Sequence, residues 1–256
     1  MIVATWNVNS IRARLERLLA WLERARPDVV CLQELKVANE AFPMEAIRAA
    51  GYHSAFHGQK TYNGVAILSR GEPSDVKIGL ADDVEDAQAR LISASIAGVR
   101  VLSVYVPNGG TVGSEAWTYK LKWLSRLREH LARHFNPADA VLLCGDLNVA
   151  VDDADAARPE EWGDTVLCHA EARSALAAVM EWGLADAFRN HNPQGGIYSW
   201  WDYRQLGFPR NNGLRLDHIL ATAPLAARST AAWVDRDERK GVKPSDHAPV
   251  LAEFDG

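Results

Sequence analysis

The sequence predicts a layered α/β sandwich, and two patterns along the chain support this prediction. Short apolar runs rich in valine, isoleucine and leucine recur between turn residues, which is typical of buried strands. Amphipathic stretches of helical length lie between these runs, and this alternation favours sheets covered by helices. No repeat, linker or low-complexity tract divides the 256 residues, so we expect residues 1–256 to form a single domain with one sizeable core.

Six apolar runs are the predicted strands. In chain order they are Ile2–Trp6, Val29–Leu32, Val101–Val106, Val141–Cys144, Leu214–Leu220 and Ala248–Phe254. Polar residues capable of chemistry lie within these runs or directly beside them. Those polar residues are therefore the first candidates for a functional site.

Three amphipathic stretches are predicted helices: Ser10–Ala25, Trp117–Phe135 and Glu171–Trp182. The first begins at Ser10, a residue type that caps helices, and stops before Pro27. The third ends at Gly183, as helices commonly do. The segment Asp152–His169 has no strong helical period and contains a proline, so we expect a surface loop there.

Composition limits the class of protein. With 48% hydrophobic and 24% charged residues, the chain is typical of globular proteins. It shows no secretion signal and no apolar run near the roughly 20 residues that span a bilayer, so we expect a cytoplasmic protein without membrane association. Three cysteines without zinc-ligand spacing fit a reducing compartment. The net charge of −5 conceals basic clusters near 120–128, 204–215 and 236–243, so charge alone neither favours nor excludes nucleic acid.

Carboxylates and amides near the strand ends predict a magnesium site. Magnesium prefers hard oxygen ligands and binds one or two protein carboxylates together with water and substrate phosphate. The residues of this type are Glu34, Asp146, Asp246, Asn7 and Asn148. Each of them alone could instead cap a turn or a helix, but all five beside apolar runs favour the metal site.

A carboxylate–histidine pair is the second candidate. Asp217 could fix the tautomer of His247 and stabilise its charged form, which suits acid–base or phosphate-binding work. His218 points to the opposite side if its segment is a strand, so His247 is preferred. The alternative is a hydrogen-bonded histidine near the core. Tyr105, which ends a strand, could donate to a phosphate or a carboxylate, although an aromatic residue there is also explained by packing.

An aromatic and basic cluster follows in the C-terminal third: Trp200, Trp201, Tyr203, Arg204, Arg210, Asn211, Asn212 and Arg215. Stacking surfaces combined with phosphate-binding groups suit nucleic acid. An aromatic core flanked by solvated arginines explains the same pattern. The glycine-rich nucleotide loops, the serine-hydrolase elbow and the zinc-peptidase motif are missing, so we expect no organic cofactor.

Seven segments together resemble the successive motifs of the exonuclease III-type abasic-site endonucleases. In order they are Trp6–Ser10, Leu32–Lys36, Gly58–Ala66, Val104–Gly109, Gly145–Asn148, Leu214–Asp217 and Pro244–Val250. They cover nearly the whole chain. The resemblance implies a four-layer α/β sandwich, in which two mixed β-sheets are flanked by helices and residues 1–256 form one catalytic domain. It also implies a Mg²⁺- or Mn²⁺-dependent enzyme that hydrolyses double-stranded DNA to a 3′-hydroxyl and a 5′-phosphate.

The resemblance also assigns roles to the candidate residues. Glu34 is the expected principal metal ligand, supported by Asn7 and Asp246. Asp146 would activate or position the attacking water. Asn148 would orient that water, while His247, paired with Asp217, and Tyr105 would hold the scissile phosphate. Whether Asp146 or His247 is the general base stays open.

Substrate recognition follows from the same resemblance. Trp200, Leu214 and Leu216 match an apolar pocket that accepts a base-free deoxyribose, and Arg204 matches a side chain placed in the DNA groove. The expected DNA-backbone contacts are Arg12, Lys60, Asn108, Lys120 and Lys122.

The loop at 158–169 is expected to lie over DNA near the cut. It carries the bulky residues Trp162, Leu167 and His169 where a small residue would leave room for a continuing strand. We therefore expect activity to shift toward 3′ termini, and replacement of Leu167 by glycine to restore internal cleavage.

Several alternatives share the motifs. The enzyme could be predominantly a 3′–5′ exonuclease and 3′-phosphatase with little abasic-site cleavage. The same scaffold also resembles inositol-phosphate phosphatases, or could serve as a non-catalytic binding module, although no metal ligand or histidine is missing. With no unexplained apolar helix face, we expect a monomer.

Overall fold

Two six-stranded mixed sheets form the centre of the protein. The computed structural model describes all residues, 1–256. The first sheet has the order β11-β12-β1-β2-β4-β3, and the second has the order β5-β6-β7-β8-β10-β9. The strands of the first sheet are β1 (Ile2–Asn7), β2 (Val29–Gln33), β3 (His53–His57), β4 (Val65–Ser69), β11 (Ser229–Val234) and β12 (Val250–Phe254). Those of the second are β5 (Ser74–Ile78), β6 (Leu91–Ile96), β7 (Val99–Tyr105), β8 (Val141–Asp146), β9 (Leu184–Asp186) and β10 (Asp217–Thr222).

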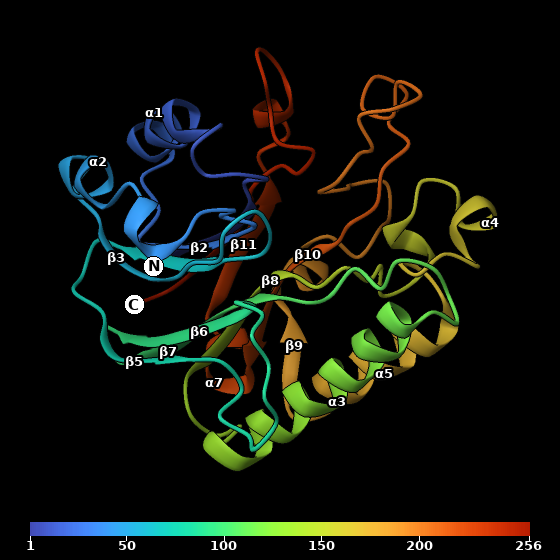
Figure 1. The fold of residues 1–256 in the computed structure, drawn as a ribbon, viewed down its shortest axis with the longest axis horizontal. Coiled ribbons are helices and arrows are strands. Elements are labelled where there is room, and N and C mark those ends of the chain that lie inside the picture. Colours follow the sequence, from blue (N-terminus) through green and yellow to red (C-terminus); the bar gives the residue numbers. More distant parts are fainter.

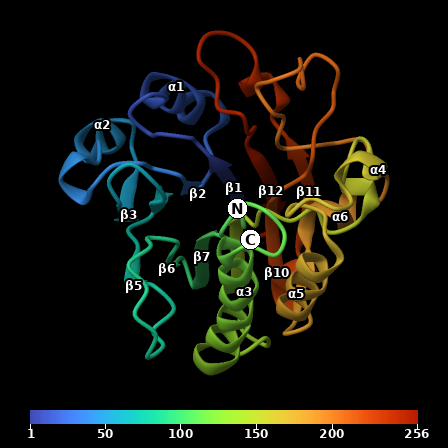
Figure 2. The same ribbon diagram turned by 45° about the vertical axis from the view of Figure 1, so that its right-hand side comes forward.

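Helices cover the outer faces of both sheets. The helices are α1 (Leu15–Ala25), α2 (Met44–Ala49), α3 (Glu115–His134), α4 (Pro159–Trp162), α5 (Ala170–Met180), α6 (Ala187–His191) and α7 (Ala223–Ala226), with 3₁₀ turns at Asn39–Ala41, Asp153–Asp155 and Arg236–Arg239. The helices α1 and α2 pack on the first sheet, while α3 and α5 pack on the second (Figure 1). Figure 2 shows α3 and α5 side by side on their face. The order helix, sheet, sheet, helix confirms the predicted four-layer sandwich.

Side chains alternate between the layers because successive residues of a strand point to opposite faces. In β8, Leu142 and Cys144 belong to the core between the two sheets, whereas Val141 and Leu143 belong to the core under α3 and α5. Strand β8 is therefore buried on both sides, which explains its apolar run from Val141 to Cys144. The strands β1, β2 and β10 follow the same pattern.

The predicted strands are confirmed with shifts at their ends. The largest shift is in the predicted run Leu214–Leu220, where regular pairing begins only at Asp217. Leu214 instead forms isolated bridges with Ala156 and Trp200. The chain ends lie together because β1 and β12 pair antiparallel, so that the Met1 amine donates to the Phe254 carbonyl.

One helix begins later than predicted. The stretch expected to start at Ser10 becomes helical only at Leu15, because Asn9 and Ser10 have φ angles of 44° and 86°, outside the helical range. The other two predicted helices occur with ends shifted by one or two residues. Ser114 caps α3 by accepting a hydrogen bond from the Trp117 backbone N–H.

The segment 152–169 is not a simple surface loop. It contains a 3₁₀ turn and α4, and several of its residues are buried: Asp155, Ala156, Val166, Leu167 and Cys168. Asp155 is held inside by Arg215, whose guanidinium donates to both carboxylate oxygens. All three cysteines are buried and unpaired. No helix combines the length and the apolar character needed to cross a bilayer.

Candidate active site

The strand topology brings the predicted site residues to one edge of the two sheets. Strands β1 and β2 are parallel, so Asn7, at the end of β1, lies near Glu34, which follows β2. In the second sheet, Tyr105 and Asp217 both pair with Asp146, the last residue of β8. Residues 246 and 247 directly precede the segment that leads into β12, which runs antiparallel to β1. The parallel strands β1, β2, β7 and β8 thus supply site residues at or just after their C-terminal ends. The antiparallel strand β10 supplies Asp217 at its N-terminal end.

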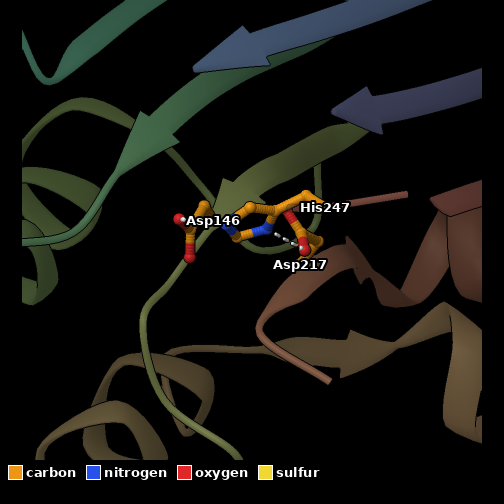
Figure 3. A group of neighbouring side chains, drawn as sticks. All are labelled: Asp146, Asp217 and His247. Atoms are coloured by element: carbon orange, nitrogen blue, oxygen red, sulfur yellow. Dashed lines mark hydrogen bonds and ion pairs between the residues drawn. The ribbon is translucent and has the colours of Figure 1, made fainter. Parts of the chain in front are cut away.

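The carboxylate–histidine pair is present at this edge. The Nδ1 atom of His247 lies 2.8 Å from an Asp217 carboxylate oxygen, and both side chains are buried (Figure 3). Ser199 donates its hydroxyl to the same oxygen at 2.6 Å. The Nδ1 atom therefore carries a proton, and the Nε2 atom faces Asp146 at 3.7 Å.

Two carboxylates stabilise the charged form of His247. Burial alone disfavours the imidazolium, but the charges of Asp217 and Asp146 outweigh it and raise the pKa of His247 to about 10. Burial raises the pKa of Asp146 to about 7. Near neutral pH the site therefore contains a cationic imidazolium beside a carboxyl group that can take up or release a proton.

Asn7 links the two sheets within the site. Its Nδ2 atom donates to Glu34 Oε1 at 2.8 Å and to Asp146 Oδ2 at 2.9 Å. The Tyr105 hydroxyl also donates to Glu34 Oε1, at 2.9 Å. Burial, together with the nearby Glu34 charge, raises the pKa of Tyr105 well above its ordinary value, so the hydroxyl stays protonated and can serve as a donor.

Asn148 is oriented by three contacts. Its backbone N–H donates to Asp146 Oδ1 at 2.9 Å, and its side-chain Nδ2 donates to the Val106 carbonyl at 3.0 Å. Its Oδ1 accepts from Asn108 Nδ2 at 3.2 Å. Asn148 has a φ of 49°, a left-handed conformation that asparagine adopts more readily than most residues. Asn108, expected to contact DNA, thus also positions Asn148.

Glu34 and Asp246 offer the hard oxygen atoms that a divalent cation prefers. They are connected through two residues that the sequence did not single out, Lys36 and Asn9. The Lys36 ammonium lies 2.8 Å from Glu34 Oε2 and donates to Asn9 Oδ1 at 2.6 Å. Asn9 Nδ2 then donates to Asp246 Oδ1 at 2.9 Å, and Trp200 Nε1 donates to Asp246 Oδ2 at 3.1 Å.

The charges of Glu34 and Asp246 are maintained despite their burial. Burial would raise the pKa of Glu34, but the Lys36 ammonium and its neighbours outweigh it and lower the pKa. The pKa of Asp246 is lowered as well, because the charge of His247 and two hydrogen bonds outweigh burial. Ionised carboxylates are the form that binds a metal ion, so the donor set fits magnesium or manganese.

A second group of possible metal ligands is formed by Asp146, Asp217 and His247, whose nearest donor atoms lie within 4.8 Å of one another. We assign this group to the carboxylate–histidine pair. A protonated imidazole whose Nδ1–H is bound to Asp217 has no free nitrogen lone pair for a metal ion.

The structure corrects the expected apolar pocket. Trp200 is half-buried and holds Asp246, but the side chains of Leu214 and Leu216 are only 0% and 2% exposed. Both belong to the core under α3 and α5, because the segment before β10 turns them inward. They support Trp200 from below and do not themselves line an open surface.

The expected DNA-backbone contacts separate into two groups. Arg12, Lys60, Arg204 and Lys122 are exposed, although Arg204 pairs with Asp202. Lys120 was expected to reach DNA phosphates, and this was wrong. Its side chain is 0% exposed because its ammonium points inward to backbone carbonyls.

The expected specificity loop is also partly corrected. Leu167 is only 6% exposed and packs in the core, so its side chain offers almost no surface that could cover DNA. Trp162 is half-buried, with its ring edge-on to Trp200 at 5.7 Å between centroids. His169 caps α5 by accepting from the Glu171 backbone N–H, and its ring lies edge-on to Trp117.

Known proteins are similar to this chain in both sequence and fold. Residues 4–247 match the Endonuclease/Exonuclease/phosphatase family. The chain is 39% identical to exodeoxyribonuclease III of Haemophilus influenzae, over 98% of each chain. An AP endonuclease structure from Archaeoglobus fulgidus superposes with a TM-score of 0.97 and 42% identity, covering all of both chains. Two structures of NExo from Neisseria each superpose with a TM-score of 0.96 and 41% identity, covering all of both chains. One is described as a 3′-5′ exonuclease, and the other as a 3′ phosphatase bound to a product DNA hairpin.

Proposed function

The chain belongs to the endonuclease/exonuclease/phosphatase family, and from that premise we propose that it is a metal-dependent DNA-repair nuclease. It hydrolyses phosphodiesters in double-stranded DNA, 5′ of abasic sites and at 3′ ends, where it removes nucleotides and blocking groups to leave a 3′-hydroxyl. The observation that carries this proposal is the cluster in which Asn7 links Glu34 to Asp146, with the His247–Asp217 pair beside them. The relatives named above are an exodeoxyribonuclease, an AP endonuclease and a 3′ phosphatase bound to a DNA hairpin, which favours DNA over other phosphodiesters.

The metal in this proposal is Mg²⁺, with Mn²⁺ as a substitute of similar ligand preference. Glu34 would be its principal protein ligand, with Asn7 and Asp246 beside it. Once bound, a hard cation polarises a phosphoryl oxygen and neutralises the charge that develops on the leaving oxygen.

The remaining groups act on the phosphate and the water. His247, charged near neutral pH, donates to a phosphoryl oxygen. The Tyr105 hydroxyl stays protonated and donates to a phosphoryl oxygen in place of Glu34 once the substrate is bound. Asp146 accepts the proton of the attacking water, whose oxygen bonds to phosphorus while the 3′ oxygen leaves and takes up a proton from solvent water to become the 3′-hydroxyl. Asn148 orients that water. The proposal assigns the base to Asp146 because an imidazolium has no lone pair with which to accept the proton.

A predominantly 3′-end-processing enzyme is the second candidate. The NExo structures, at 41% identity, come from a protein described as an exonuclease and a 3′ phosphatase. In this chain Trp162 packs against Trp200 beside the site, and its bulk would impede a duplex that continues past the cut. The AP endonuclease at 42% identity supports the first candidate about equally.

We further infer that the enzyme acts as a cytoplasmic monomer. Every candidate site residue comes from the same chain, so the site needs no partner subunit. Three buried, unpaired cysteines fit a reducing compartment.

One assay tests the activity and separates the two candidates. End-labelled duplexes carrying an internal abasic analogue, a recessed 3′ end or a 3′-phosphate are incubated with Mg²⁺ or with EDTA. We expect Mg²⁺-dependent cleavage that EDTA abolishes and that an Asp146→Asn variant lacks. A discrete product at the analogue supports abasic-site cleavage, whereas a ladder or phosphate release with the analogue intact supports 3′-end processing. Cleavage of none of the duplexes would refute the proposed function.

A further inference from the structure

A fully buried lysine lies directly beneath the active site. Lys120 is on α3, on the face that packs against the second sheet, and its side chain is 0% exposed. Its ammonium donates to three backbone carbonyls, those of Val166 at 2.5 Å, Asn148 at 2.7 Å and Asn108 at 3.1 Å. Gly109 leaves room for the stem, since a Cβ atom there would lie 2.9 Å from Lys120 Cδ.

The three carbonyls belong to three different segments around the site. Asn108 follows β7, Asn148 follows β8, and Val166 belongs to the segment between α4 and α5. An ammonium group has three N–H donors, so three carbonyl acceptors satisfy it completely. Burial lowers the pKa of Lys120 to about 7, but the three acceptors favour the protonated form because a neutral amine has only two N–H donors.

Burying an ammonium is costly, and a methionine or leucine would fill the same space without that cost. The partners of Lys120 are carbonyls of the residues that orient the reaction. The side-chain amide of Asn108 donates to Asn148 Oδ1. The backbone carbonyls of the same two residues both accept hydrogen bonds from the Lys120 ammonium. The Asn148 side chain in turn lies 3.4 Å from Asp146 Oδ2.

We propose that Lys120 is a positioning residue that holds Asn108 and Asn148 in the geometry required for phosphodiester hydrolysis. The proposal rests on the proposed function, in which Asn148 orients the attacking water. Lys120 does not contact the substrate. It acts through the loop backbones, so its loss should change the rate of the chemical step more than the affinity for DNA.

Kinetics of two Lys120 variants test this proposal. Lys120→Met keeps the stem and removes all three donors, while Lys120→Gln keeps one donor group and provides a second folded variant if the first is unstable. We expect kcat on the wild type's preferred duplex to fall about 10²-fold in Lys120→Met, the size of loss expected for a misplaced catalytic group. KM should change less than about threefold, because Lys120 itself does not contact the DNA. Lys120→Gln should show a smaller loss of kcat.

Leu131→Ala is the matched control. Leu131 is equally buried on α3, three turns further from the site, so its truncation should lower the melting temperature without lowering kcat. A decrease in kcat that merely follows melting temperature across all three variants would overturn the proposal.

A double mutant separates positioning from a general structural effect. Because Lys120 acts through Asn148, the double variant Lys120→Met/Asn148→Ala should be no slower than Asn148→Ala alone. If the decrease in kcat of the double variant equals the product of the decreases in the two single variants, the proposal is overturned. An unchanged kcat in a folded Lys120 variant would overturn it as well. Absence of cleavage by the wild-type enzyme would instead refute the proposed function, so the two failures are distinguishable.

Discussion

At the scale of single residues, two buried histidines next to β8 differ in charge because their neighbours differ. His247 lies between the carboxylates of Asp217 and Asp146, which stabilise its imidazolium. His218 contacts the Arg215 guanidinium through Nδ1, and a guanidinium can only donate, so that nitrogen is an unprotonated acceptor. Its Nε2–H then donates to the Val149 carbonyl. His247 is thus equipped to bind an anion, while His218 is a neutral structural link.

Replacing the partner carboxylate tests the role of the charged His247. In Asp217→Asn the amide keeps a hydrogen-bonding shape but removes the charge that favours the imidazolium. We expect the single-turnover rate of DNA cleavage to fall by about 10² or more, the usual cost of a lost transition-state donor. Asp83→Asn, an exposed aspartate on the loop before β6, serves as the control and should keep the wild-type rate. A rate within about threefold of wild type in Asp217→Asn would contradict the assigned role.

Residue type and position predicted the candidate ligands, but not the contacts between them. Glu34, Asp146 and His247 each adjoin an apolar run, so sequence alone placed them at strand ends. Lys36 and Asn9 carry no such signal, since their contribution depends on left-handed turns that bring them together. Burial of a lysine is equally invisible in the sequence because most helical lysines are solvated.

At the scale of secondary-structure elements, buried strands were the most predictable feature. Strands such as β8 are apolar up to their last residues, and a polar residue such as Asp146 marks where the strand ends. The start of α1 was missed because Ser10 is a residue type that caps helices, whereas its backbone N–H here donates to the Glu34 carbonyl. The segment 152–169 was mistaken for a surface loop because the partners of its buried aspartate, Arg189 and Arg215, lie far along the chain.

The expected specificity loop, residues 158–169, carries the prediction on substrate preference. Leu167 is unsuitable for the test, since its truncation would leave a cavity in the core. Trp162 is suitable, because it is half-buried and lies against Trp200. We expect Trp162→Ala to raise cleavage at an internal abasic analogue relative to 3′ trimming by roughly tenfold, as removal of a modest steric barrier would.

The ratio of the two rates is measured on paired duplexes under identical Mg²⁺ conditions. Tyr62→Ala, which removes an exposed aromatic side chain outside the specificity loop, is the control for a general loss of aromatic surface. An unchanged ratio in Trp162→Ala would show that Trp162 does not restrict the continuing strand.

At the scale of the whole molecule, the site depends on how the two sheets pack. Asn7 comes from the first sheet and Asp146 from the second, and their hydrogen bond crosses the interface. A sequence pattern indicates which face of a strand is buried, but not the position of one sheet relative to the other. The sequence was therefore sufficient to predict the α/β sandwich as a fold class. It could not predict the distances within the site, because these depend on how the core packs between the two sheets.

The stability of the whole molecule should depend on pH through His130. This histidine lies on α3, where Nδ1 contacts the Leu80 carbonyl at 2.6 Å, while the buried Nε2 has no hydrogen-bond partner. Burial lowers the pKa of His130 from 6.5 to about 4. Between these two values the unfolded chain binds a proton that the folded protein does not, so the contribution of His130 is fully present above pH 6.5 and is lost as the pH falls toward 4.

Urea denaturation at several pH values measures the contribution of His130 to the unfolding free energy, as the difference between the wild type and His130→Gln. Between pH 7 and pH 4 the wild type should lose up to about 3 kcal/mol more unfolding free energy than His130→Gln, which cannot titrate. The comparison removes other titrating groups, such as Asp146, which both proteins share. His53→Gln, which changes an exposed histidine on β3, should retain the wild-type pH dependence. Parallel curves for the wild type and His130→Gln would show that the folded protein accommodates a proton on the buried His130 Nε2 at little cost.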